Sequence, residues 1–299
     1  MAVPGLGPED LLLVLGRALA VGTLFVAFGT ALIRRCVAGV PTPDADRSLQ
    51  RLQWAALGAA VAATLLWCAT ETAAMAGTDS PAAMLAMLPA VLSGTAFGHL
   101  VLIRVGLLAL AAAATVGGAS ALATVLIGLA VVVQAGHLHA FAMRPGPSLL
   151  LAAEALHVLA AGAWLGSLPA LLILVAATPA ERAGMAARRF SALGIAAVLT
   201  VAASAAWLAW QLVGTWAGLL DSAYGRVALA KLALFAVLVA LAGRNRLWLV
   251  PRTMAGGTAA QRRLRRSIAA AAVIGVIVVA LASLLSTLPP AIDLVSAPP

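Results

Sequence analysis

Eight apolar stretches, each long enough to cross a lipid bilayer as a helix, constrain this sequence more than any other feature. One crossing needs roughly 20 apolar residues, and the stretches lie near residues 11–33, 53–76, 99–117, 120–140, 149–177, 190–216, 227–248 and 267–288. The chain is 63% hydrophobic and 10% charged, whereas soluble proteins are about 45–50% apolar and about 25% charged. We therefore predict an all-α, polytopic membrane protein with eight transmembrane helices, in which residues 1–299 form a single integral-membrane domain.

A ninth apolar segment, residues 81–98, is a weaker candidate for a crossing. Pro89 interrupts it, and Gly94 and Gly98 lower its helix propensity. A short amphiphilic segment of this kind is typical of the membrane interface. We expect residues 81–98 to form an interfacial or re-entrant helix.

The distribution of arginine predicts the orientation, because cytoplasmic loops are enriched in Arg and Lys. With the N-terminus outside, the outer loops carry only Arg144 and Arg226. The inner loops then carry Arg34, Arg35, Arg47, Arg51, Arg182, Arg188, Arg189, Arg244, Arg246, Arg252, Arg262, Arg263, Arg265 and Arg266. Eight crossings therefore place both termini on the outer side, which is the periplasm if the membrane is a bacterial inner membrane, and a ninth would move the first basic cluster outside.

The same distribution explains the net charge of +9 without a nucleic-acid partner.

The N-terminus has no basic region before its apolar run, so we expect a retained first span and no cleaved signal peptide. Cys36 and Cys68 form no CxxC motif and are predicted to be structural thiols. No GxxxxGK[ST] phosphate loop is present, so transport would be passive or driven by an ion gradient or the membrane potential.

Ionisable residues inside the predicted spans are the main candidates for function, because each is costly to place in hydrocarbon. In the predicted topology all of them fall in the outer half of their helices. They are Arg17, Glu71, His99, Arg104, His137, His139, Glu154, His157 and Lys231. We therefore predict one polar layer below the periplasmic surface.

Glu154 and His157 stand one helical turn apart, and Trp164 continues the same face. A carboxylate beside an imidazole can fix its tautomer and support metal ligation. The alternative is a buried polar pair that hydrogen-bonds a neighbouring helix, and the spacing leaves both readings open.

Histidine and methionine gather on the predicted outer side. His137 and His139 close one span with Met143 shortly after, His99 opens another, and Met84 and Met87 lie in the interfacial segment. Imidazole and thioether ligands favour copper, Cu(I) in particular, although methionine in apolar sequence is often only a space filler. Arg17, Arg104 and Lys231 would repel a metal ion unless they pair with Glu71 and Glu154 or face an anion such as a lipid phosphate or haem propionate.

Several ordered blocks resemble one family. Ala153–Leu168, AEALHVLAAGAWLGSL, is similar to the LH-x6-W-x-G signature of the bacterial copper resistance protein D family. TAFGHLVLIR, RFSALG, YGRVALAKLALF and NRLWLVP resemble other blocks, so the resemblance is strongest over residues 95–252. The matched residues are Arg104, His157, Trp164, Gly166, Tyr224, Gly225, Arg226, Lys231, Asn245 and Arg246, and Ser167 replaces an expected glycine.

The resemblance implies a non-enzymatic, eight-helix protein of the bacterial inner membrane that moves copper, as Cu(I) or Cu(II), with a periplasmic copper-binding protein delivering the metal. The first hypothesis is therefore copper import through a site of His157, Glu154, His137, His139, His99, Met84, Met87 and Met143. The second is a membrane redox protein with a single haem on the periplasmic side. The third is an assembly or sensing subunit whose histidines are structural.

Overall fold

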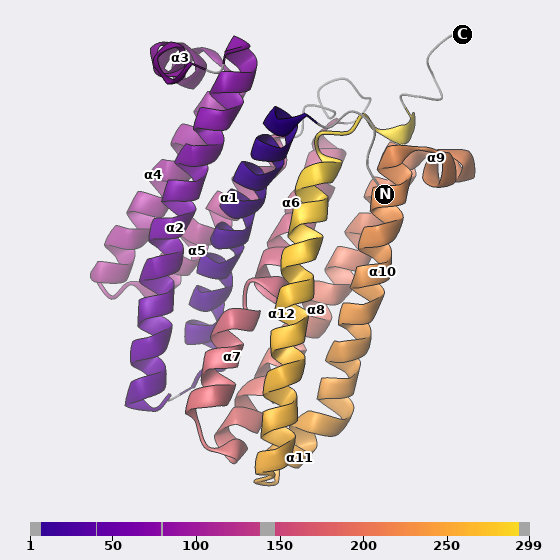
Figure 1. Ribbon diagram of the computed structural model, residues 1–299. Coiled ribbons are helices and arrows are strands. Elements are labelled where there is room, and N and C mark those ends of the chain that lie inside the picture. Colours follow the sequence, from indigo (N-terminus) through magenta and orange to yellow (C-terminus); the bar gives the residue numbers. More distant parts are fainter. Residues whose placement is uncertain (1–6, 40, 79, 138–146, 293–299) are drawn as a thin grey trace.

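The computed structural model describes residues 7–39, 41–78, 80–137 and 147–292. All regular structure in these residues is helical. The elements are α1 (Pro8–Leu32), η1 (Ile33–Val37), α2 (Pro43–Ala76), α3 (Pro81–Gly94), α4 (Ala96–Val116), α5 (Ser120–Val133), η2 (Gln134–His137), α6 (Pro147–Leu165), α7 (Leu168–Ala177), α8 (Ala180–Val213), α9 (Trp216–Asp221), α10 (Ala223–Arg244), η4 (Asn245–Leu249), α11 (Val250–Met254) and α12 (Thr258–Leu285). Figure 1 shows the long helices side by side in one bundle.

Within the described residues, eight helical segments are long and apolar enough to cross a membrane, which confirms the predicted number. They are Asp10–Val37, Pro43–Ala76, Ala96–Val116, Ser120–His137, Ser148–Ala177, Ala180–Val213, Ala223–Met254 and Thr258–Leu285. The second, sixth and eighth begin well before the predicted residues 53, 190 and 267. Their first turns are polar and charged, so hydropathy alone missed them.

α3 lies across the bundle and does not run along it, as Figure 1 shows. Its 14 residues span about 21 Å, which is short of the roughly 30 Å of a hydrocarbon core. The turn into α4 is tight, because a Cβ on Gly98 would lie 2.1 Å from the Val91 carbonyl oxygen. Residues 81–94 thus form the separate short helix expected from the sequence, and we call this side of the bundle the α3 end.

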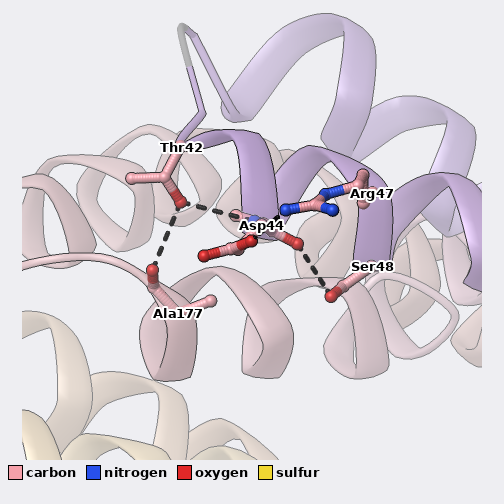
Figure 2. A network of polar contacts seen from close by, with 6 residues as sticks. Thr42, Asp44, Arg47, Ser48 and Ala177 are labelled. Carbon is pink, nitrogen blue, oxygen red and sulfur yellow. Dashed lines mark hydrogen bonds and ion pairs between the residues drawn. The ribbon is translucent and has the colours of Figure 1, made fainter.

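The opposite side, which we call the basic end, carries the connections from α1 to α2, from α7 to α8 and from α10 to α12 (Figure 1). Thr42 caps α2 by accepting a hydrogen bond from the Ala45 amide at 3.3 Å, and its hydroxyl donates to the Ala177 carbonyl at 3.3 Å (Figure 2). Gln261 of α12 donates to the carbonyls of Val175 and Thr178. The end of α7 is therefore bonded to the starts of α2 and α12.

The fifth predicted span is broken in its middle, between α6 and α7. At this break α1 approaches so closely that a Cβ on Gly166 would lie 1.9 Å from the Phe25 carbonyl oxygen, and one on Gly29 would lie 2.1 Å from the Gly166 carbonyl carbon. Ser167 is fully buried, and its one hydroxyl hydrogen has the Ala163 carbonyl of α6 at 2.7 Å and the Gly29 carbonyl of α1 farther away, at 3.2 Å. The serine found in place of an expected glycine thus bonds mainly within its own span, with the α1 backbone as the longer contact.

The two largest of four apolar clusters in the described residues pack most of the bundle. One includes Leu24, Ala60 and Ile127, and joins α1, α2 and α5. The other includes Leu174, Ala183 and Leu264, and joins α7, α8 and α12. The described ionisable residues of the predicted layer lie early in α1, α4, α6 and α10, late in α2 and in η2, so they gather toward the α3 end of the bundle.

Candidate functional site

The most buried part of this layer is centred on Arg104 of α4. Its Nη2 donates to Gln134 Oε1 at 2.6 Å and lies 3.2 Å from His137 Nδ1. The exposed fractions of Arg104, Gln134 and His137 are 0%, 3% and 5%. Gln134 and His137 begin and end the 3₁₀ turn η2, and residues three apart in such a turn eclipse each other. The change from α-helix to 3₁₀ helix therefore brings both side chains to Arg104.

Aromatic rings enclose this centre. The His137 ring lies 4.8 Å from that of Trp67 and 5.3 Å from that of Phe97, centroid to centroid. The guanidinium carbons of Arg104 and Arg17 lie 5.3 and 5.5 Å from the Trp67 ring. Cations at these distances are attracted to the negative face of an indole. Trp67 thus links α1, α4 and η2.

Several polar atoms at the centre have no partner. Arg104 Nε and Nη1, Gln134 Nε2 and His137 Nε2 are buried without a hydrogen bond. Each such group costs about 1–3 kcal/mol when it is left unsatisfied. The Arg104 and Gln134 atoms are donors, so the centre offers hydrogen bonds to a water molecule or to another acceptor.

His137 Nδ1 has two competing neighbours at 3.2 Å, Arg104 Nη2 and the Val133 carbonyl oxygen. Arginine can only donate and a carbonyl can only accept, so the tautomer of His137 satisfies one or the other. Copper binding at Nε2 requires the tautomer that donates from Nδ1 to Val133. Arg104 favours the opposite tautomer.

His157 of α6 is held differently. Its Nδ1 lies 3.0 Å from Ser204 Oγ of α8, and that hydroxyl is itself 2.6 Å from the Thr200 carbonyl oxygen, to which it donates. The serine has one hydrogen, and where the Thr200 carbonyl takes it, at the shorter distance, His157 Nδ1 donates to Oγ. The lone pair of His157 then resides on Nε2, the arrangement that metal-ligating histidines adopt.

Glu154 interacts electrostatically with Lys231 of α10 and Arg17 of α1, and Lys231 in turn with His157. The contact that orients His157 therefore comes from Ser204 of the neighbouring helix, which is what the second of the two open interpretations of the Glu154–His157 pair expected. Arg17 also interacts with Glu71, which accepts a hydrogen bond from Trp67 Nε1 at 3.2 Å. Arg17 thus interacts electrostatically with charged residues near both His157 and Arg104.

The other predicted site residues are more dispersed. His99 is exposed, with Nε2 2.9 Å from the Ser93 carbonyl oxygen. Met84 is half-buried and Met87 is exposed, both on α3. Trp164 lies in apolar surroundings with its ring against that of Phe235 at 6.0 Å, and not among the polar residues. His139 and Met143 lie outside the described residues.

Within the described part of the chain, no group of three or more His, Cys, Asp or Glu side chains is placed to hold a metal ion. The expected convergence of His99, His137 and His157 on one site is therefore not formed there, because each histidine has its own partner. Copper binding by these residues, one after another, stays a prediction.

Gln134 and Ser204 are the two contact residues that the sequence interpretation missed. Both are neutral and lie in apolar helices, where serine looks like a small packing residue. Gln134 had a usable signal, since it is an amide among apolar residues three positions before His137.

Two family models match the chain. Residues 8–148 match the model described as copper resistance protein D-like, N-terminal domain, and residues 184–285 match the model described as copper resistance protein D. No curated protein and no solved structure matches the chain significantly. The two matched segments together contain the ionisable residues of the polar layer, except Glu154 and His157, which lie in the sequence between the two segments.

Proposed function

Because the chain belongs to the copper resistance protein D family, we propose that it carries copper ions from the periplasm to the cytoplasm across the bacterial inner membrane. Membership implies a role in copper resistance or transport, and the family is generally not enzymatic. We assign the α3 end to the periplasm, because the opposite end carries the arginine-rich connections.

The observation that carries the proposal is the hydrogen bond of His157 to Ser204, which leaves the lone pair on Nε2. Its Nδ1 is engaged by Ser204, so Nε2 presents a lone pair inside the bundle. Neutral imidazole nitrogen suits copper better than it suits Mg²⁺ or Ca²⁺. A site with few ligands also fits passage, because a permeant ion must bind weakly enough to leave.

On this proposal Met84, Met87 and His99 receive the ion at the α3 end, directly or from a periplasmic copper-binding protein. His139 and Met143 would add ligands at the same end. Glu154 offsets part of the positive charge of Lys231 and Arg17 and so lowers the electrostatic cost of a cation near His157.

The test is copper influx into proteoliposomes that contain a copper-sensitive dye. We expect His157→Ala to reduce the rate to that of empty liposomes. Ser204→Ala should slow influx by about tenfold, the usual effect of removing a residue that orients a ligand. Ser283→Ala is the matched control, because Ser283 is a buried serine that bonds only the Val279 carbonyl of its own helix. Equal influx for wild type and His157→Ala would refute the role of His157.

The haem alternative receives no support at His137. Trp67 and Phe97 pack against the imidazole, and the residue is 5% exposed. A porphyrin would need the space that these rings occupy. We expect the purified protein to contain copper without a Soret band, and a Soret band at stoichiometric intensity would favour haem.

A further inference from the structure

A groove of about 230 Å³ lies among α7, α8, α10 and α12. It is separate from the polar layer, because it uses the part of α10 beyond Leu238, whereas Lys231 lies earlier on that helix. α10 runs from the α3 end to the basic end (Figure 1). The groove is therefore close to the membrane surface that carries the arginines.

The walls of the groove are apolar and one side is open. Leu171, Phe190 and Leu238 line its interior, and Ile195 and Leu199 line it with exposed fractions of 44% and 65%. In a membrane-spanning chain, an exposed apolar face of this kind faces lipid. Its shape and lining fit a hydrocarbon chain.

Polar groups occur at the end of the groove nearest the basic end. Asn245 and Arg246 line it there, on the π-helical turn η4. Asn245 Oδ1 is buried without a hydrogen-bond partner, so it can accept a hydrogen bond from a ligand. The Arg246 side chain is exposed, and within the described residues the ion pairs under 4 Å are Arg34–Asp46 and Arg47–Asp44. The groove thus ends in one cation and one unused acceptor.

We propose that this groove binds one anionic glycerophospholipid with a hydroxylated headgroup, of the phosphatidylglycerol type. One acyl chain occupies the apolar groove, the phosphate contacts Arg246, and a headgroup hydroxyl donates to Asn245 Oδ1. Two alternatives fit less well, because a quinone has no anion for Arg246 and a choline headgroup has no donor for Asn245 Oδ1. The proposal is independent of copper transport.

The test is native mass spectrometry of the detergent-purified protein titrated with phosphatidylglycerol and phosphatidylcholine of identical acyl chains. We expect one tightly bound phosphatidylglycerol and a preference of about fivefold over phosphatidylcholine, the effect of one arginine on an anionic lipid. Arg246→Gln should abolish the preference. Arg262→Gln, which removes an exposed cation outside the groove, should keep it.

A second arm fills the groove. Gly194 lines the groove, and a Cβ there would be in ordinary van der Waals contact with Trp164 Cδ1 at 3.8 Å, so Gly194→Leu should fill the groove and remove the tight lipid. Gly106→Leu is the control, on an exposed face of α4 with nothing within 4 Å. If Gly194→Leu does not fold, Gly243→Leu fills the same groove, because Gly243 also lines it and has nothing within 4 Å.

Three outcomes would overturn the proposal. They are equal affinity for the two lipids in wild type, an unchanged preference in Arg246→Gln, and a tight lipid retained when the groove is filled. Decylubiquinone added in excess should leave the bound lipid in place, and displacement would identify the groove as a quinone site. The lipid experiment does not measure copper influx, so it can fail while the transport test succeeds, and the reverse.

Discussion

Arg104 is the largest fully buried side chain in the described residues, and its surroundings account for only part of its hydrogen-bonding capacity. Gln134 Oε1 accepts one bond while Gln134 Nε2 stays without a partner and faces no acceptor. A buried charge with few partners depends strongly on each one that it has. Gln134 should therefore control the stability of this centre.

We predict opposite effects for two substitutions of Gln134. Gln134→Leu removes the acceptor of Arg104 and should lower the free energy of unfolding by about 2 kcal/mol. Gln134→Glu replaces the unpaired amide nitrogen with a second acceptor and adds the opposite charge, so it should raise the unfolding temperature. Thermal unfolding in one detergent compares both with wild type. The same sign for both changes would contradict the charge argument.

The sequence identified Arg17, Glu71, His99, Arg104, His137, His139, Glu154, His157 and Lys231 as one layer, because ionisable residues in spans are few. It suggested that the cations pair with Glu71 and Glu154, as Arg17 and Lys231 do, but it did not predict the contacts of Arg104 and His157. Those contacts depend on the 3₁₀ turn at Gln134 and on the packing of α6 against α8, which brings Ser204 to His157. Neither follows from hydropathy.

At the scale of elements, the closest approach is between α1 and the break from α6 to α7. The opposing groups at Gly29 and Gly166 are backbone atoms, so no side chain can rotate away to make room. The sequence identified Gly166 as a match to the family signature. It did not identify Gly29 as the partner, because small residues are common in every helix of this chain.

We predict that Gly166→Ala destabilises the protein by about 3 kcal/mol or more, because the added methyl overlaps the Phe25 carbonyl and α1 must shift. Gly106→Ala should have little effect, since a Cβ there meets nothing within 4 Å. Unfolding monitored by size-exclusion fluorescence after heating measures the difference. Equal stability of the two variants would show that α1 and α6 can separate without cost.

At the scale of the whole molecule, the eight spans were predictable because each apolar stretch is long. The polar first turns of several of these helices were not predictable from hydropathy. The helix of α2 begins at Pro43, where Thr42 caps it, although the apolar stretch begins near residue 53. Capping residues define helix ends better than hydropathy does. The orientation rests on the arginines alone.

We predict that the basic end faces the cytoplasm. In a background with Cys36 and Cys68 replaced by serine, Ala82→Cys on α3 and Ala255→Cys at the basic end are both exposed positions. A membrane-impermeant maleimide should label Ala82→Cys in intact spheroplasts and Ala255→Cys only after permeabilisation. The reverse pattern would invert the topology and the proposed direction of transport.

The polar layer also has a consequence for which ions pass. Its cationic members are Arg17, Arg104 and Lys231, and its carboxylates are Glu71 and Glu154, so one positive charge is left over when the histidines are set aside. Coulomb repulsion scales with the charge of the permeating ion. If copper passes through this layer, as proposed, a doubly charged ion is repelled twice as strongly as a singly charged one, and we expect cuprous ions to pass ahead of cupric and zinc ions.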